Sequence, residues 1–339
     1  MAIANQAFSP REWTVLIRPQ IEWGETEAGT DMYQLDVDSI SMPTLNNYQT
    51  MDVRNTAGRT FNDEDFFQDN KMRAVEMTFS GNFHTDSAHK YPFLNLANIA
   101  TSNDNVTINP GMQPASLGNG VSISAGTMSS HHLFTIAVAA PETTNAKNML
   151  FHNCVCTNFT ISADTATDGG RYKYSATFSA GGAGAATTAS TTAVAPTASY
   201  LNTTNVTMGG ISASSFKVAD INATLKSFSV VVDFPAVWTG AGSFGYETVN
   251  RGQECSITFD AQVKYDNLTD GLLNTWDTQA AAVDGVGLNI VNSANFDIAI
   301  NDYILTNVAL SEGDIMMLDI TGKSVDDGAE ALLALDWTA

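Results

Sequence analysis

The segment Val75-Glu76-Met77-Thr78-Phe79-Ser80-Gly81-Asn82-Phe83 alternates apolar or small side chains with polar ones. Successive side chains of a β-strand point to opposite faces, so this alternation predicts a strand with one buried and one solvated face. The same period recurs elsewhere, and β-branched runs predict further strands. These segments are residues 159–163, 172–178, 228–232, 254–260, 303–310 and 315–320. The sequence therefore predicts a mainly β protein.

Helical patterns are rare in this sequence. Residues 269–276 begin with Thr269, a residue suited to capping, and place Leu268, Leu272, Leu273 and Trp276 on one face. A second candidate is 91–97, where Pro92 is tolerated in a first helical turn. We therefore expect one short helix in each half of the chain.

The order of the predicted elements occurs twice. Residues 157–162 parallel residues 306–311, and each segment precedes a turn and a last strand. Met77-Thr78-Phe79 and Ile257-Thr258-Phe259 each precede a predicted short helix. Small residues from Gly181 to Pro196 are typical of a linker. We accordingly divide the chain into an N-terminal arm (1–30), a first domain (31–182), a linker (183–214) and a second domain (215–339). Residues 101–130, rich in Asn, Gly, Pro and Ser, are expected to form a loop inserted in the first domain.

The charge of the chain excludes several classes of protein. Its 339 residues are 44% hydrophobic and 15% charged, so it can bury a core. The formal net charge is −21, which should repel nucleic acid phosphates.

No run of about 20 apolar residues is present, which predicts that the chain does not span a membrane. The start of the chain lacks a secretory signal pattern, so we expect it to fold in the cytoplasm where it is made.

A search for catalytic or metal-binding patterns identifies none. The five histidines do not have the spacing of a zinc site, and the three cysteines include no Cys-x-x-Cys. The glycines at 181–184 lack the lysine and the following helix of a phosphate-binding loop. We therefore expect no cofactor, no metal and no enzymatic activity.

Three groups of segments together resemble the duplicated-domain tail tube proteins of tailed bacteriophages, also called major tail proteins. They are residues 79–96, residues 153–161 with 169–171 and 175–178, and residues 227–232 with 252–259. The resemblance implies two tandem β-sandwich or barrel-like domains that assemble into a ring with a β-barrel lumen. It also implies a virion tail protein, assembled in the host cytoplasm, whose stacked rings give a channel for passage of the genome during ejection without specific binding. The net charge of −21 leads us to expect that this channel is acidic. The implied partners are other copies of the chain, a tape measure protein, and tail terminator and baseplate proteins. The insertion at 101–130 departs from the family pattern.

The resemblance also implies the number of chains in a ring. Since the family forms rings of six tube domains, two domains per chain predict a trimeric ring with pseudo-six-fold symmetry. A ring of six chains is the alternative.

Strand alternation predicts which side chains line the lumen. The polar face should carry Glu76, Thr78 and Ser80 in the first domain and Glu254, Thr258, Asp260, Asp319 and Thr321 in the second. The alternative is that the same side chains lie on the outer surface, where charge is tolerated equally well.

Two long segments, 45–71 and 234–253, exceed the usual length of a hairpin turn. We expect them, with the N-terminal arm, to contact the neighbouring ring. The aromatic residues predicted to make these contacts are Trp13, Trp23, Phe61, Phe66, Phe67, Trp238, Phe244 and Tyr246. The alternative is that these segments pack on their own domain.

A second function remains open from the sequence. An extracellular or virion-surface β-sandwich that binds carbohydrate or mediates adhesion would share the composition. Such a module should gather Trp and Tyr on its loops, whereas the five Trp residues here are scattered along the chain.

Overall fold

The computed structural model describes residues 12–19, 32–42, 49–50, 66–67, 75–84, 105–108, 121–122, 133–139, 148–186, 193–194, 206–211, 216–239, 248–251, 255–273, 283–292, 296–325 and 332–336. Antiparallel strands dominate these ranges, which confirms the prediction of a mainly β protein. The segment that opens the sequence analysis forms β6 (Val75–Asn82), and its side chains alternate between buried and accessible as predicted.

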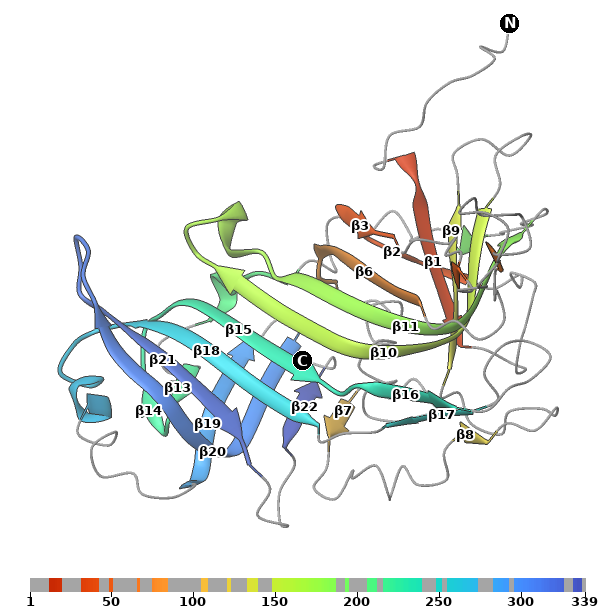
Figure 1. The fold of residues 1–339 in the computed structure, drawn as a ribbon. Coiled ribbons are helices and arrows are strands. Elements are labelled where there is room, and N and C mark those ends of the chain that lie inside the picture. Colours follow the sequence, from red (N-terminus) through yellow and green to blue (C-terminus); the bar gives the residue numbers. More distant parts are fainter. Residues whose placement is uncertain are drawn as a thin grey trace, which may run out of the picture.

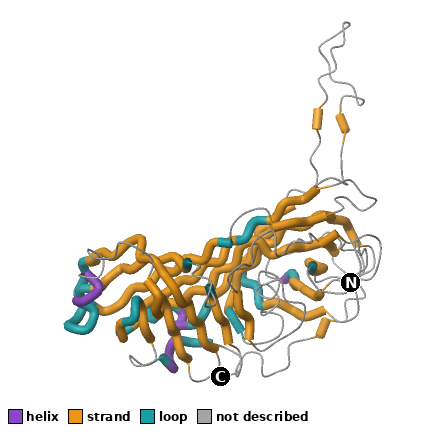
Figure 2. The backbone as a smooth tube through the Cα atoms, turned by 90° about the horizontal axis from the view of Figure 1, so that it is seen from below, coloured by secondary structure: helices purple, strands orange, loops and turns teal. Residues whose placement is uncertain are grey.

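One curved antiparallel sheet runs along the length of the molecule (Figures 1 and 2). In spatial order its strands are β3 (Ser39–Ser41), β6, β11 (Lys173–Ala186), β10 (Asn148–Asp164), β15 (Leu225–Asp233), β18 (Ser256–Lys264), β21 (Met317–Ser324) and β20 (Phe296–Ser311). Strands β10 and β15, from the two halves of the sequence, are direct neighbours, so the sheet crosses from one half to the other without a break.

The long strands β10 and β20 each also pair with a second set of strands. The first half of β10 pairs with β9 (Phe134–Ala139), which leads to β1 (Thr14–Pro19), β2 (Met32–Leu35) and β12 (Ala193–Val194). The first half of β20 pairs with β19 (Val283–Asn292), which leads to β13 (Phe216–Val218) and β14 (Ile221–Asn222). It also pairs with β22 (Leu333–Asp336), the neighbour of β7 (Asn105–Ile108). Following these pairings never leads back to the starting strand, so the described sheet is not closed into a barrel.

The remaining elements are small. Strands β8 (Val121–Ser122), β16 (Ala236–Thr239) and β17 (Thr248–Arg251) form a three-stranded sheet, and β4 (Gln49–Thr50) pairs with β5 (Phe66–Phe67). Short 3-10 turns cover Asp168–Gly170 and Met208–Gly210, and residues 270–273 are helical. One large hydrophobic cluster joins both halves of the chain, from Val15 to Leu335, and a small second cluster contains Leu133, Val155 and Val249.

The two halves of the chain arrange five strands in the same way. In the first half the spatial order is β3-β6-β11-β10-β9, and in the second half it is β15-β18-β21-β20-β19. Both sets also follow the same order along the chain. The strand pairings therefore contain the same arrangement twice.

A β-bulge occurs at the same place in both sets. The pairing of β10 with β11 shifts register between Cys156 and Asn158, and that of β20 with β21 shifts between Leu305 and Asn307. A bulge leaves one extra residue outside the ladder and bends the strand. Both long strands therefore bend at the first residue of the segments 157–162 and 306–311, which the sequence pattern matches with each other.

The residue at each bulge is a threonine that makes the same hydrogen bond. The hydroxyl of Thr157 donates to the carbonyl oxygen of Thr177 at 3.3 Å, and that of Thr306 donates to the carbonyl oxygen of Thr321 at 3.2 Å. Each acceptor belongs to the residue that lies opposite the asparagine following the bulge.

Several predicted boundaries need correction. Thr14–Pro19, assigned to the N-terminal arm, forms β1 inside the sheet, because Val15, Leu16 and Ile17 are all buried in the core. The predicted linker begins inside β11, since Ala183–Ala186 pair with Asn148–Phe151. The predicted loop at 101–130 contributes β7 and β8, which both pair with strands of the second half.

The helix predictions are partly confirmed. Residues 270–273 are helical, but the residue that caps this turn is Asp266, which accepts the backbone N–H of Leu268 at 3.0 Å. Thr269 is fully buried and donates its hydroxyl to the carbonyl of Lys264. Leu268, predicted to lie on the buried face, is 58% exposed. The predicted helix at 91–97 lies outside the described residues.

Candidate functional site: the polar face of the sheet

The face of the long sheet that points away from the main core carries mostly polar side chains, with Val231 and Ala309 among the exceptions and Val155 covered by Trp238. Rows of directly opposed residues cross the sheet on this face. One row is Ser41, Thr78, Thr177, Asn158, Asp233 and Ser256. Another row is Asn82, Lys173, Ser162, Ser229, Asp260, Thr321 and Asn307. Hydroxyl, amide and charged groups in these rows thus form a hydrogen-bonding surface that reaches both halves.

Side chains on this face hydrogen-bond across neighbouring strands. The hydroxyls of Thr78 and Thr177 lie 2.9 Å apart, and Thr321 donates to the carboxylate of Asp260 at 2.7 Å. The two pairs occupy equivalent positions, because Thr177 lies opposite Asn158 and Thr321 lies opposite Asn307, the asparagines that follow the two bulges. Cross-strand pairs of this kind stabilise a sheet by a few tenths to about 1 kcal/mol each. They also hold the polar side chains in defined positions along the face.

The polar face carries charges of both signs. Its carboxylates belong to Glu76, Asp164, Asp233, Asp260 and Asp319, and its ammonium groups belong to Lys173, Lys264 and Lys323. Acidic groups are in excess, but the excess is small beside the net charge of −21 of the whole chain. The described face is therefore only weakly acidic.

The structure brings seven of the eight predicted lumen residues onto this one face. Glu76, Thr78 and Ser80 lie on β6, opposite the buried side chains of Met77 and Phe79. The others lie on the neighbouring strands of the second half: Thr258, Asp260, Asp319 and Thr321. Glu254 lies outside the described residues. What the face meets in an assembly stays a prediction.

Sequence reasoning missed several members of the same face. Thr177, Ser162 and Ser229 occupy central positions, and Gln262 donates to Asp319 at 2.6 Å. The alternation at 172–178 contained the signal for Thr177. It would have been found if every predicted strand had been divided into faces.

The aromatic residues predicted to contact a neighbouring ring are described only in part. Trp238 on β16 donates its indole N–H to the hydroxyl of Ser179 at 2.9 Å and lies directly over Gly181, where even a Cβ would come within 2.4 Å of the ring. Trp13 packs against the core of its own chain. Both therefore pack within their own chain, although Trp238 contacts the first predicted domain and not its own, and a further contact with another ring stays a prediction. The side chains of Phe66 and Phe67, and all of Trp23, Phe61, Phe244 and Tyr246, lie outside the described part.

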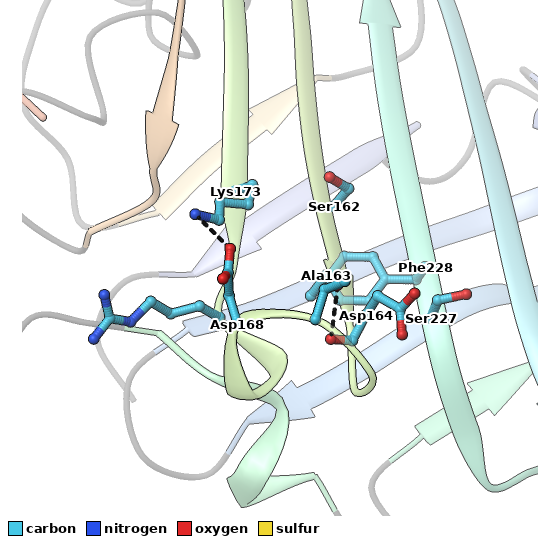
Figure 3. Close-up of a pocket in the computed structure, with 9 residues that line it drawn as sticks. Ser162, Ala163, Asp164, Asp168, Lys173, Ser227 and Phe228 are labelled. Atoms are coloured by element: carbon cyan, nitrogen blue, oxygen red, sulfur yellow. Dashed lines mark hydrogen bonds and ion pairs between the residues drawn. The ribbon is translucent and has the colours of Figure 1, made fainter. Parts of the chain in front are cut away.

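A small hollow opens where the turn between β10 and β11 meets β15 (Figure 3). Lys173 reaches into this region and pairs with Asp168 at 3.0 Å, while Phe228 forms its apolar wall. Its volume is about 210 Å³, below the roughly 300–1,000 Å³ typical of small-molecule sites. Lysine and aspartate also neutralise each other here, so the hollow is a poor candidate for a ligand site.

Reactive or metal-binding groups do not gather within the described ranges. No three His, Cys, Asp or Glu side chains there are placed to hold a metal ion. Burial raises the pKa of the Cys154 thiol, which disfavours the nucleophilic thiolate. In the same part of the chain, no helix is long and apolar enough to cross a membrane.

The polar face is thus the candidate functional surface among the described residues. No protein-family model matches the sequence, and no curated protein matches it.

Proposed function

We propose that this protein is a structural subunit of a bacteriophage tail tube, in which rings of the chain stack around a channel for DNA. One observation carries the proposal: a single curved sheet continues through both halves of the chain, with an apolar core on one face and an ordered polar face on the other. A sheet of this kind becomes the wall of a channel when several copies close around an axis.

Physical chemistry favours closure of the sheet. A strand at the edge of a sheet exposes unpaired backbone groups, and a closed ring of subunits removes such edges. The two equivalent sets of strands fit the tandem tube domains of the family. Three chains would then supply six units to a ring.

The polar face has suitable chemistry for a channel wall. Double-stranded DNA carries about one negative charge per 1.7 Å, so a strongly cationic wall would bind it tightly. The described face instead presents hydroxyls and amides with a small excess of carboxylates, which gives weak repulsion and few strong contacts. We accordingly assign Glu76, Thr258 and Asp260 to the channel. The role is structural rather than catalytic, and the partners would be the tape measure, terminator and baseplate proteins of the virion.

Electron microscopy of the purified protein tests the assembly directly. We expect stacked rings or tubes with an open channel and three chains in each ring. Discrete globules at all concentrations would overturn the proposal and would favour a binding or adhesion module. Rings of six chains would retain the tube function and refute only the predicted number of chains.

Accessibility of the polar face gives a second test. In a Cys255→Ser background, Thr258→Cys places a thiol on the polar face, and Val291→Cys places a matched thiol on β19, away from that face. Both variants are biotinylated with a maleimide before assembly. In the free subunit streptavidin should bind both, whereas in tubes it should bind only the Val291→Cys variant. Equal binding to both in tubes would show that the polar face lies outside.

A further inference from the structure

The edge of β10 carries two neighbours in succession, whereas the edge of β20 carries one. Along the edge of β10 that faces away from β11, the first half pairs with β9 and the second half, Asn158–Asp164, pairs with β15. Along the equivalent edge of β20, the first half pairs with β19. The second half, Asn307–Ser311, has no strand partner on this side among the described residues.

The strand that would complete this pattern is present at the other end of the sheet. β3 and β15 hold the same position in their sets, since β3 pairs with β6 and β15 pairs with the equivalent strand β18. Their sequences agree, with Ser39-Ile40-Ser41 matching Ser227-Phe228-Ser229. β15 has β10 on its second edge, whereas β3 has no strand there in the described part of the chain.

Equivalent positions differ in burial between the two outer edges of the sheet and the internal junction. Ser227 and Ser229 of β15 are half-buried, whereas Ser39 and Ser41 of β3 are exposed. On the other strand, Ile161 of β10 is 1% exposed and the equivalent Leu310 of β20 is 44% exposed. Both ends of the sheet thus show more surface than the same positions at the internal junction between β10 and β15.

The edge formed by β3 is held in place before any partner binds. The hydroxyl of Tyr174 donates to the carbonyl of Asp36 at 2.8 Å, and the Asp36 carboxylate lies 2.7 Å from Nε2 of His84. The backbone of Asp36 also passes so close to Gly81 that a Cβ there would lie 2.2 Å from its carbonyl oxygen. These contacts fix the approach to β3, so little order has to be gained when a strand pairs with it.

We propose that the Asn307–Ser311 edge of β20 pairs, antiparallel, with β3 of a second copy of this chain, and that this contact repeats the internal β10–β15 junction. Ser162 lies four residues after the bulge asparagine Asn158 and is opposite Ser229. Ser311 lies four residues after Asn307, and Ser41 occupies the position of Ser229. The register therefore places Ser311 opposite Ser41, and Leu310 opposite Met42. Only the closure of such contacts into a ring rests on the proposed function.

Disulfide trapping tests both the contact and its register. The Ser41→Cys/Ser311→Cys variant, in a Cys255→Ser background, should form disulfide-linked oligomers under mild oxidation, because opposed residues of antiparallel strands lie about 4.5–5.5 Å apart. The Ser39→Cys/Ser311→Cys variant is the matched control for register and should lose most of this cross-linking. The Ser162→Cys/Ser229→Cys variant is the positive control and should form its disulfide within one chain.

The outcomes separate this proposal from the tube function. Cross-linking in the stated register without tubes would support the edge contact and count against the tube. Tubes that give no cross-link, or a cross-link favoured by Ser39→Cys, would overturn the edge contact alone. A protein that stays monomeric in sedimentation at its highest soluble concentration would overturn both. Leu310→Lys, which places a charge on an exposed edge, should abolish the cross-link while the far-UV circular dichroism stays unchanged.

Discussion

The strands β10 and β20 have the same bulge, the same threonine hydrogen bond and, after the bulge, equivalent neighbours on one side (β11 and β21), yet their apolar faces differ in burial. Phe159 and Ile161 of β10 are 0% and 1% exposed. At the equivalent positions of β20, Val308 is half-buried and Leu310 is 44% exposed. The difference coincides with β15, which flanks β10 and has no counterpart beside β20 in the described ranges.

This comparison shows that burial here depends on the adjoining sheet more than on the strand itself. β15 brings Val230 and Val232 into the core beside β10. The same local sequence pattern, Thr-Asn followed by alternating apolar residues, can therefore form either a core strand or a sheet edge. Substitutions at equivalent positions should consequently have different effects.

The largest difference is expected between Ile161→Ala and Leu310→Ala. Truncation of a fully buried aliphatic side chain should lower the free energy of unfolding by about 2–5 kcal/mol. Leu310→Ala should cost less than about 1 kcal/mol in the isolated subunit, because much of that side chain already meets solvent. Urea denaturation monitored by tryptophan fluorescence measures both values. Equal losses would show that the two strands are buried alike.

A smaller effect on stability is expected at one pair of opposed residues in the core, where the two halves place the larger side chain on different strands. In the first half Met77 lies opposite Phe178, whereas in the second half Phe259 lies opposite Gly322. A Cβ at Gly322 would come within 2.3 Å of the Phe259 ring. Gly322→Ala should therefore lower the free energy of unfolding by about 1–3 kcal/mol through overpacking. Lys323→Ala, on the polar face of the same strand, is the matched control and should change it by less than about 0.5 kcal/mol. A neutral Gly322→Ala would mean that the ring can move aside.

The ends of β6 and β18 provide a third contrast. After β6 the chain is held by the contact between His84 and Asp36, and after β18 it turns at Asp266. The pKa of Asp266 is lowered from its ordinary value, chiefly by the backbone N–H of Leu268 and further by that of Thr269 and the charge of Lys264. A lowered folded-state pKa means a stabilising contribution that is present at neutral pH and is lost as the pH falls through the folded pKa.

We expect Asp266→Ala to cost about 1 kcal/mol at pH 7, as for other capping residues. The difference from the unsubstituted protein should shrink at pH 3, and Asp266→Asn, which keeps an acceptor, should lie between the two at pH 7. Urea denaturation at both pH values gives these differences. A penalty that does not depend on pH would exclude the carboxylate as its source.

The sequence predicted strands and faces better than it predicted register. Alternation over residues 75–83 identified β6 and its buried side correctly. The match of 157–162 with 306–311 also agrees with the two bulges. The sequence pattern matched Met77 with Ile257, however, and this match is wrong by two residues. The strand pairings show that the residue equivalent to Met77 is Phe259. An alternation with a period of two identifies the face on which a residue lies, but it does not identify which residue of the neighbouring strand lies opposite.

Contacts between distant segments were beyond the reach of the pattern. Trp238 lies over Gly181 because glycine leaves room for the indole, and neither residue indicates the other in the sequence. Thr14–Pro19 was assigned to an arm because strands covered on both sides lack alternation. For the candidate site, seven of eight residues were placed on a common face, whereas the small charge excess of that face emerged only when Lys173, Lys264 and Lys323 were placed on it.

The internal β10–β15 junction also has a consequence for the entropy of assembly. Each association of free subunits costs an estimated 4–15 kcal/mol in lost translational and rotational freedom. Joining two units in one chain makes their contact intramolecular, with an effective concentration on the order of millimolar. A ring of six units built from three such chains would need three intermolecular contacts, and the other three would already exist in each folded chain. When two units belong to one chain, their equivalent positions can also carry different residues, as Thr78 in the first half and Asp260 in the second half do.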